Sequence, residues 1–126
     1  MPAARREDIP IAEAMEGYAG RFERWGSLTA AFEKLPGGLD LAPLLEGLPD
    51  DKCQCPHWGF LERGRIRVRY ADHDETIEAG QAYYMAPGHA PVFELDSETL
   101  EFSPTEELGK TFEAIRRNLD RTAAGA

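Results

Sequence analysis

The sequence is short of positive charge. Of its 126 residues, 14 are lysine or arginine and 23 are aspartate or glutamate, which gives a net charge of −9 at pH 7. A surface that binds nucleic acid needs a stripe of basic side chains to meet the phosphates. The charge balance therefore argues against a nucleic-acid partner.

Long hydrophobic runs are also missing. No apolar stretch approaches the roughly 18 residues that a membrane-spanning helix needs. The first ten residues, MPAARREDIP, lack the apolar core of a signal peptide. We therefore expect no membrane partner and a cytoplasmic protein, in which the two cysteines stay reduced. A disulfide between Cys53 and Cys55 would also close a very small ring of difficult geometry.

Common catalytic and phosphate-binding motifs are absent as well, since the chain has no Walker loop, no GxGxxG and no Ser-His-Asp motif. What remains is an ordinary globular composition, 42% apolar and 29% charged. Twelve glycines and nine prolines divide it into many short segments. The length fits a single domain, residues 1–126, with one core.

Alternation of apolar and polar residues indicates that most of these segments are β-strands. The clearest strand is residues 65–70, where Ile66, Val68 and Tyr70 alternate with arginines. Further short strands are expected at 28–35, 82–85, 91–95 and 99–102. Strands of this length and spacing are typical of a mainly β sandwich or barrel.

A helix is predicted after the last strand, from about residue 104 to 120. Ser103 is its expected N-cap, with Pro104 at the first helical position and Glu106 completing a capping box. An apolar stripe follows at helical spacing, made of Leu108, Phe112, Ile115 and Leu119. The stripe needs a surface to cover, either the end of the barrel or a second subunit. Together with the sheet edges of such a barrel, it predicts a homodimer.

Four residues predict a metal site. Cys53, Cys55 and His57 are spaced by two, so one strand would point two thiols and an imidazole to the same side. His89 follows the Pro87-Gly88 turn and can supply a fourth donor. Thiolates and imidazoles suit zinc in a tetrahedral site. The alternative is that both cysteines are small core residues and His57 is a hydrogen-bonded barrel histidine.

The segment around these donors resembles the first motif of the cupin family, G-x5-H-x-H-x(3,4)-E-x6-G. His57 is followed by six residues and Gly64, and it stands where the motif has glutamate. Cys53 stands where the second histidine falls in the short-spaced form, and Cys55 is an extra donor between them.

A second segment resembles the other cupin motif, G-x5-P-x-G-x2-H-x3-N. The stretch from Gly80 to Gly88 has its length and its two glycines, whereas Ala86 replaces the proline. Pro91 occupies the histidine position and His89 lies two residues earlier. The resemblance covers residues 28–102. It implies a double-stranded β-helix, or jelly-roll, barrel from about residue 15 to 102, with the C-terminal helix packed outside.

The resemblance implies a metal-binding cupin-domain protein that acts on or binds a small molecule at a metal centre. The donors favour zinc, with iron, nickel or copper as alternatives. Trp58, Tyr83 and Tyr84 are candidates for a substrate pocket, although Tyr83 and Tyr84 must face opposite sides of a strand.

Whether the protein is an enzyme stays open, because cupins include dioxygenases, isomerases and decarboxylases. A closed site of two cysteines and two histidines would indicate a non-catalytic binding or sensing protein. A third reading is a metal-free barrel that binds an apolar small molecule.

Overall fold

Ten short β-strands and a long C-terminal helix make up residues 2–124, the part of the chain that the computed structural model describes. The strands are β1 Ile11–Met15, β2 Tyr18–Trp25, β3 Leu28–Leu35, β4 Leu39–Asp40, β5 His57–Arg63, β6 Arg65–Arg69, β7 Asp74–Glu78, β8 Ala82–Met85, β9 Ala90–Phe93 and β10 Ser97–Pro104. The helix α1 is Thr105–Ala124. Three short 3₁₀ turns lie at Arg6–Asp8, Ala42–Leu44 and Pro49–Asp51.

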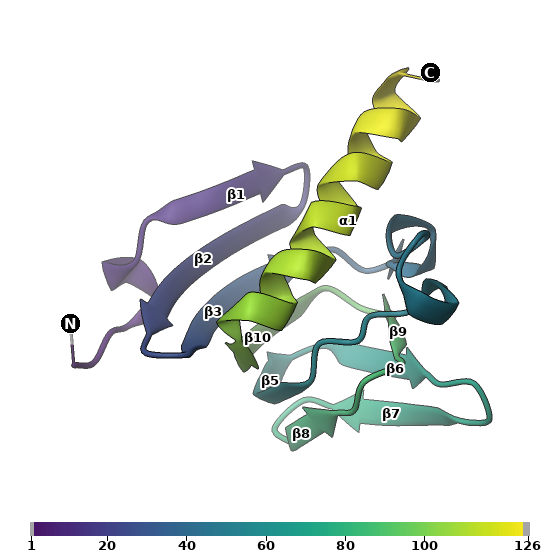
Figure 1. Ribbon diagram of the computed structural model, residues 1–126. Helices are drawn as coiled ribbons and strands as arrows, with labels where there is room; N and C mark the ends of the chain where they lie inside the picture. The colour runs from purple at the N-terminus through teal and green to yellow at the C-terminus, as the bar shows by residue number, and fades with distance from the viewer. Residues whose placement is uncertain (1, 125–126) are drawn as a thin grey trace.

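The strands form two antiparallel sheets that face each other. One has the order β1-β2-β3-β10-β5-β8 and the other the order β4-β9-β6-β7. The chain crosses between the sheets several times, so that β10 lies between β3 and β5. In Figure 1 the strands β5 to β9 curl into the lower half of the molecule, beside the β1–β3 hairpins. The expected mainly β jelly-roll with a C-terminal helix is thereby confirmed.

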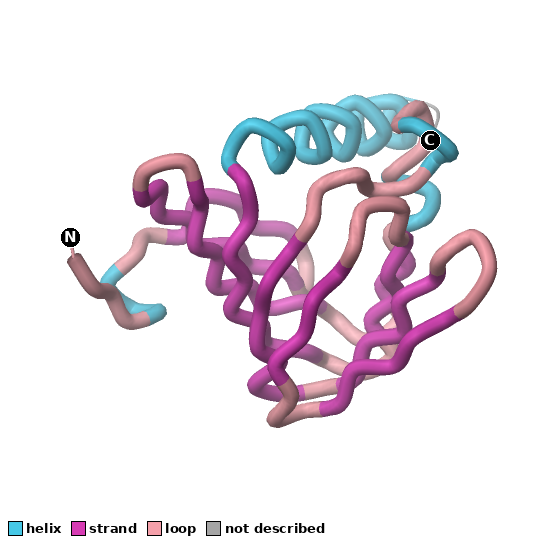
Figure 2. Tube along the Cα trace, turned by 60° about the horizontal axis from the view of Figure 1, so that its bottom comes forward, coloured by secondary structure: helices cyan, strands magenta, loops and turns pink. Residues whose placement is uncertain are grey.

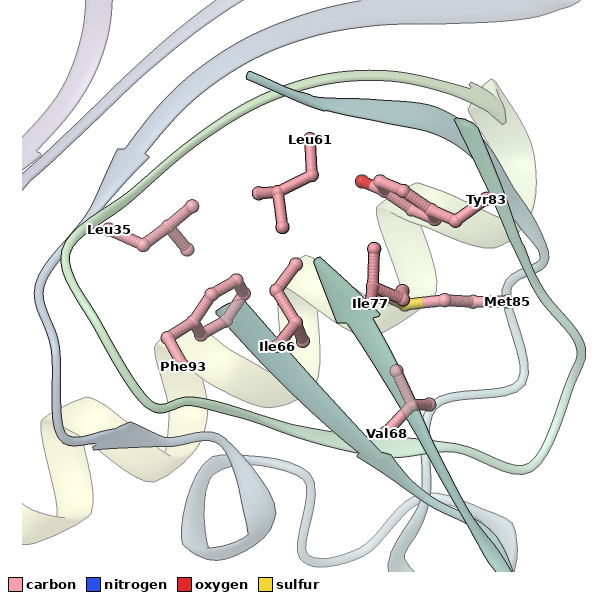
Figure 3. Packing of buried hydrophobic residues seen from close by; sticks show 8 residues of the cluster. All are labelled: Leu35, Leu61, Ile66, Val68, Ile77, Tyr83, Met85 and Phe93. Atoms are coloured by element: carbon pink, nitrogen blue, oxygen red, sulfur yellow. The ribbon is translucent and has the colours of Figure 1, made fainter. Parts of the chain in front are cut away.

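The main core fills the space between the two sheets. On β6 the side chains of Ile66 and Val68 are fully buried, while Arg67 between them is exposed. This is the two-residue period of a strand with one face in the core. Figure 3 shows the side chains that converge there. They are Leu35, Leu61, Ile66, Val68, Ile77, Tyr83, Met85 and Phe93.

Helix α1 closes one end of the barrel, as the turned view of Figure 2 shows. Its expected apolar stripe packs against the molecule itself, since Leu108, Phe112 and Ile115 contact a cluster that contains Leu45 and Cys53. The stripe is therefore not free to bind a second subunit. No helix among residues 2–124 is long and apolar enough to cross a membrane.

Two boundaries differ from the expected ones. The strands begin at Ile11 rather than near residue 15, and the helix runs to Ala124 rather than 120. Ser103 is not an N-cap, because it and Pro104 belong to β10 and the helix begins at Thr105. The sheet pairing of Ser103 with Thr29 of β3 outweighs the local capping signal.

The close packing around Gly59 gives a testable prediction. A Cβ at this position would lie 2.5 Å from the Tyr83 ring and 2.8 Å from the Leu100 carbonyl oxygen. We expect Gly59→Ala to destabilise the protein by about 2 kcal/mol in urea unfolding, because the added methyl overpacks the core. Gly109→Ala is the matched control, since its Cβ meets no atom on the surface of α1. Gly109→Ala should stabilise the protein by about 0.5–1 kcal/mol. Equal effects of the two variants would contradict the close packing at Gly59.

Candidate metal centre

Three of the four expected donors come together inside the barrel. The ligand atoms of Cys53, His57 and His89 all lie within 4.8 Å of one another. The three residues keep 3%, 8% and 1% of their surface exposed. Cys53 Sγ is 3.8 Å from His57 Nε2, and the two imidazole rings are 5.0 Å apart. One ion placed between the three atoms would reach all of them.

Backbone pairing places Cys53 beside His89. The Cys53 amide donates to the His89 carbonyl at 2.9 Å, and the Gly88 amide donates to the Cys53 carbonyl at 2.8 Å. Gly88 has φ +93°, a conformation that other residues rarely adopt. The Pro87-Gly88 turn thus directs His89 inward, as the sequence predicted.

Each imidazole is oriented by a protein partner at its Nδ1 atom. His89 Nδ1 lies 2.6 Å from the Ala86 carbonyl oxygen, which only accepts hydrogen bonds, so Nδ1 carries the proton. His57 Nδ1 lies 2.7 Å from Ser103 Oγ and 3.2 Å from Glu101 Oε1. Metal-binding histidines are oriented by such contacts at their second nitrogen.

Burial prepares both histidines for metal binding. It lowers the pKa of His57 to about 4. It also lowers the pKa of His89 to about 4, outweighing the hydrogen bond to Ala86. Both rings are therefore neutral at pH 7, the form that binds metals. Burial raises the pKa of the Cys53 thiol, an effect that its 3.3 Å hydrogen bond with Thr111 of α1 opposes.

Cys55 lies outside this group, and the expected Cys-x-Cys-x-His motif is not confirmed. The two-residue alternation requires a continuous strand, but β5 begins only at His57. The Cys55 thiol points to the Pro56 carbonyl at 3.5 Å. Burial, followed by the nearby Cys53, raises its pKa to about 12. A role for Cys55 as fourth ligand therefore stays a prediction without support from this geometry.

The three aromatic candidates are divided between the two faces of the sheet. Trp58 and Tyr84 pair across β5 and β8 on the outer face, where they are 47% and 51% exposed. This placement follows from alternation, because Trp58 is adjacent to the inward-facing His57, and a role of Trp58 and Tyr84 in a substrate pocket stays a prediction. Tyr83 faces inward, and its hydroxyl donates to Glu101 at 2.5 Å.

The metal donors line a cavity of about 160 Å³ that the barrel shares with α1. Two carboxylates inside it, Glu33 and Glu101, are residues that sequence reasoning missed. Each accepts a hydrogen bond from a tyrosine: Tyr18 donates to Glu33 at 2.6 Å and Tyr83 donates to Glu101. The sequence contained a signal for both glutamates, because the alternation of side chains along a strand places each of them on the inward face. Thr111 carried no such signal, because its contact depends on how α1 docks.

Burial raises the pKa of both carboxylates, and the charge of Glu101 raises that of Glu33 further. Glu33 reaches a pKa of about 7. A carboxyl group whose folded pKa is raised contributes its full stability below its unfolded pKa. That contribution is lost as the pH rises through the folded value.

A charge-neutral substitution at Glu33 tests this sign. We expect Glu33→Gln to stabilise the metal-free protein by up to about 3 kcal/mol at pH 8.5, because the amide keeps an acceptor for Tyr18 without a buried charge. The gain should shrink toward zero at pH 5. Urea unfolding at both pH values measures it, with the exposed Glu16→Gln as control. If the gain is the same at both pH values, the charge of Glu33 does not change between pH 5 and pH 8.5, and the raised pKa is contradicted.

The sequence matches no known protein-family model, and no curated protein matches it. The structure, in contrast, is similar to several solved proteins. An RmlC-like cupin from Shewanella frigidimarina is 15% identical, with a TM-score of 0.57 over 81% of this chain and 89% of that chain. KdgF from Halomonas sp. is 17% identical, with a TM-score of 0.54 over 79% and 90%.

The iron(II) form of HppE is 13% identical, with a TM-score of 0.55 over 79% of this chain and 58% of HppE. Identities this low establish a shared fold and leave the reaction open. They agree with the mainly β architecture of two facing antiparallel sheets. On this topology and these likenesses, the chain has the cupin fold.

Proposed function

We propose that the protein binds one divalent metal ion through Cys53 Sγ, His57 Nε2 and His89 Nε2, and that it binds a small molecule beside that ion. The observation that carries the proposal is the convergence of three buried donors, two of them oriented through their second nitrogens. One sulfur and two nitrogens suit zinc, with iron, nickel and copper as alternatives. A reduced thiol in the site also favours a cytoplasmic location.

The number of protein donors favours a catalytic site over a closed one. Structural zinc sites have four protein ligands, whereas catalytic sites have three and leave a position for water or substrate. Here three donors converge and Cys55 does not join them. A metal in such a site polarises a bound carbonyl or activates water. We therefore infer a metal-dependent enzyme, and the non-catalytic alternative requires Cys55 as fourth ligand.

Metal content tests the proposal with matched controls. We expect about one zinc ion per chain in protein purified with zinc, and its loss in Cys53→Ser and His89→Ala, because each removes a coordinating atom. Cys55→Ser and the exposed His73→Ala should keep the ion. Elemental analysis measures the metal content of each variant. In the wild type, chelation should lower the melting temperature in proportion to the metal that is removed.

Two outcomes contradict parts of the proposal. Equal metal content in all four variants would mean that these residues hold no ion and that the buried cysteine and histidines are core residues. Loss of metal in Cys55→Ser would instead support the closed site of two cysteines and two histidines. In that case the protein would be a binding or sensing module.

We further propose that the homodimer forms through the outer face of the six-stranded sheet. Two cross-strand rows on this face contain no charged side chain. They are Ala30-Phe102-Trp58-Tyr84 and Phe32-Leu100-Phe60-Ala82. The exposed large side chains of these rows are Trp58, Phe60 and Tyr84, on β5 and β8. Three neighbouring aromatic side chains exceed the scattered apolar residues that are normal on a monomer.

Charge favours a second copy as the occupant of this patch. The chain carries a net charge of −9, so two copies repel each other over most of their surfaces. The two rows have no charged side chain of their own, and charges of both signs border Trp58, Phe60 and Tyr84: Arg6 lies over the Phe32 ring at 5.1 Å, and Arg63 pairs with Glu98 at 3.2 Å. A two-fold axis lets such a self-complementary surface meet itself.

A charge placed in the patch tests the dimer. We expect Trp58→Lys to reduce the mass measured by light scattering from that of two chains to that of one, because a dimer would bury the ammonium group. Leu95→Lys, at another exposed apolar residue, should leave the dimer intact. A monomeric wild type, or a dimer that Trp58→Lys does not affect, would overturn this interface.

A further inference from the structure

The cavity beside the metal donors has mostly apolar walls. From the barrel, Leu35, Leu39 and Phe93 line it. From α1, the inner face of the helix contributes Phe112, Ile115 and Leu119. These α1 side chains belong to the apolar stripe that was expected to cover either the end of the barrel or a second subunit, and they form the roof of the cavity.

One end of the cavity is open and the other is deep. Met15 of β1 lines it and is 52% exposed. Glu13 and Arg116 line it as well and form an ion pair at 3.1 Å, with side chains 51% and 63% exposed. Cys53 and His89, in contrast, are buried. The cavity thus leads from an opening between β1 and α1 to the metal donors.

The two carboxyl groups at the deep end each accept a hydrogen bond from a tyrosine. Glu33 accepts from Tyr18, and Glu101 accepts from Tyr83 and faces His57. A ligand therefore finds its polar contacts at the metal end of the cavity and meets mostly apolar side chains along the rest of its length. An oligosaccharide or a polyanion would leave its own polar groups without partners against these walls.

The volume limits the size of the ligand. The cavity measures about 160 Å³. An apolar cavity of about 150 Å³ in another protein holds a benzene molecule. A ligand body of about one six-membered ring, or a short branched alkyl chain, fits this space.

We propose that the small molecule bound by this protein has a single metal-coordinating polar head and an apolar body of about one ring, with the head at Cys53, His57 and His89 and the body under α1. The inference rests on the proposed metal site and names the class of ligand that the site accepts. The apolar roof of Phe112, Ile115 and Leu119 selects the body, and the metal orients the head.

Two probes with the same neutral head separate these contributions. Imidazole supplies a metal-binding nitrogen alone, and 4-phenylimidazole adds an apolar ring to it. We expect zinc-loaded protein to bind 4-phenylimidazole roughly 30-fold more tightly than imidazole in isothermal titration calorimetry, the order expected for removing one phenyl ring from water. A third probe, 4-(hydroxymethyl)imidazole, should bind no more tightly than imidazole.

The outcomes distinguish this inference from the proposed function. If both probes bind with equal affinity, or the phenyl compound binds more weakly, the apolar class is overturned while the metal site stands. If neither probe binds zinc-loaded protein whose metal content is confirmed, the ligand class is overturned because the ion has no open position. If the protein retains no zinc, both the metal site and the inference fail.

A variant of the roof supplies the matched test. Ile115→Asn places an amide on the inner face of α1 and removes no metal donor. It should reduce the affinity for 4-phenylimidazole about tenfold and leave the affinity for imidazole unchanged, which also shows that the variant is folded. Leu95→Asn, an exposed residue outside the cavity, is the control and should change neither. An unchanged affinity for the phenyl compound in Ile115→Asn would place the ring elsewhere and overturn the inference.

Discussion

The candidate metal centre depends on the backbone pairing between Cys53 and His89. The two residues lie on separate loops, one before β5 and one before β9, and the hydrogen bonds at 2.9 and 2.8 Å join these loops. Ordering two loops independently would cost conformational entropy at each of them. The pairing orders both at once and sets the thiol beside the imidazole. His57, on the first residue of β5, then completes the group from the sheet.

A series of polar contacts connects these residues to the interior of the barrel. Tyr83 donates to Glu101, Glu101 faces His57, and His57 also contacts Ser103. Buried polar atoms are costly unless they are paired, so a connected network of this kind fixes each member in one orientation. The core beside it is formed mainly by aliphatic residues such as Leu61 and Ile66. Tyr83 belongs to this core and joins it to the polar network through its hydroxyl group.

The parts of the molecule that the sequence predicted are those in which local pattern and tertiary structure agree. The alternation around Ile66 and Val68 was enough for a buried strand, and Pro87-Gly88 was enough for the turn that presents His89. The spacing did not determine the direction of the Cys55 side chain, because the residues before His57 are not in a strand, and the Cys-x-Cys-x-His motif is not confirmed. Ser103 carries a strong capping signal, yet sheet pairing places it against His57. Thr111 could not be found, because only the docking of α1 brings it to Cys53.

Strand β5 carries the candidate metal ligand His57 and the exposed Trp58 as consecutive residues, one on each face of the sheet. In a strand, a shift of the pairing by one residue exchanges the two faces. Such a shift would place an indole among the metal donors and an imidazole on the outer aromatic rows. Bound metal would therefore favour the correct register during folding, since only that register brings a third donor to Cys53 and His89. A bound ion would thus stabilise the correct register of β5 in addition to binding a small molecule.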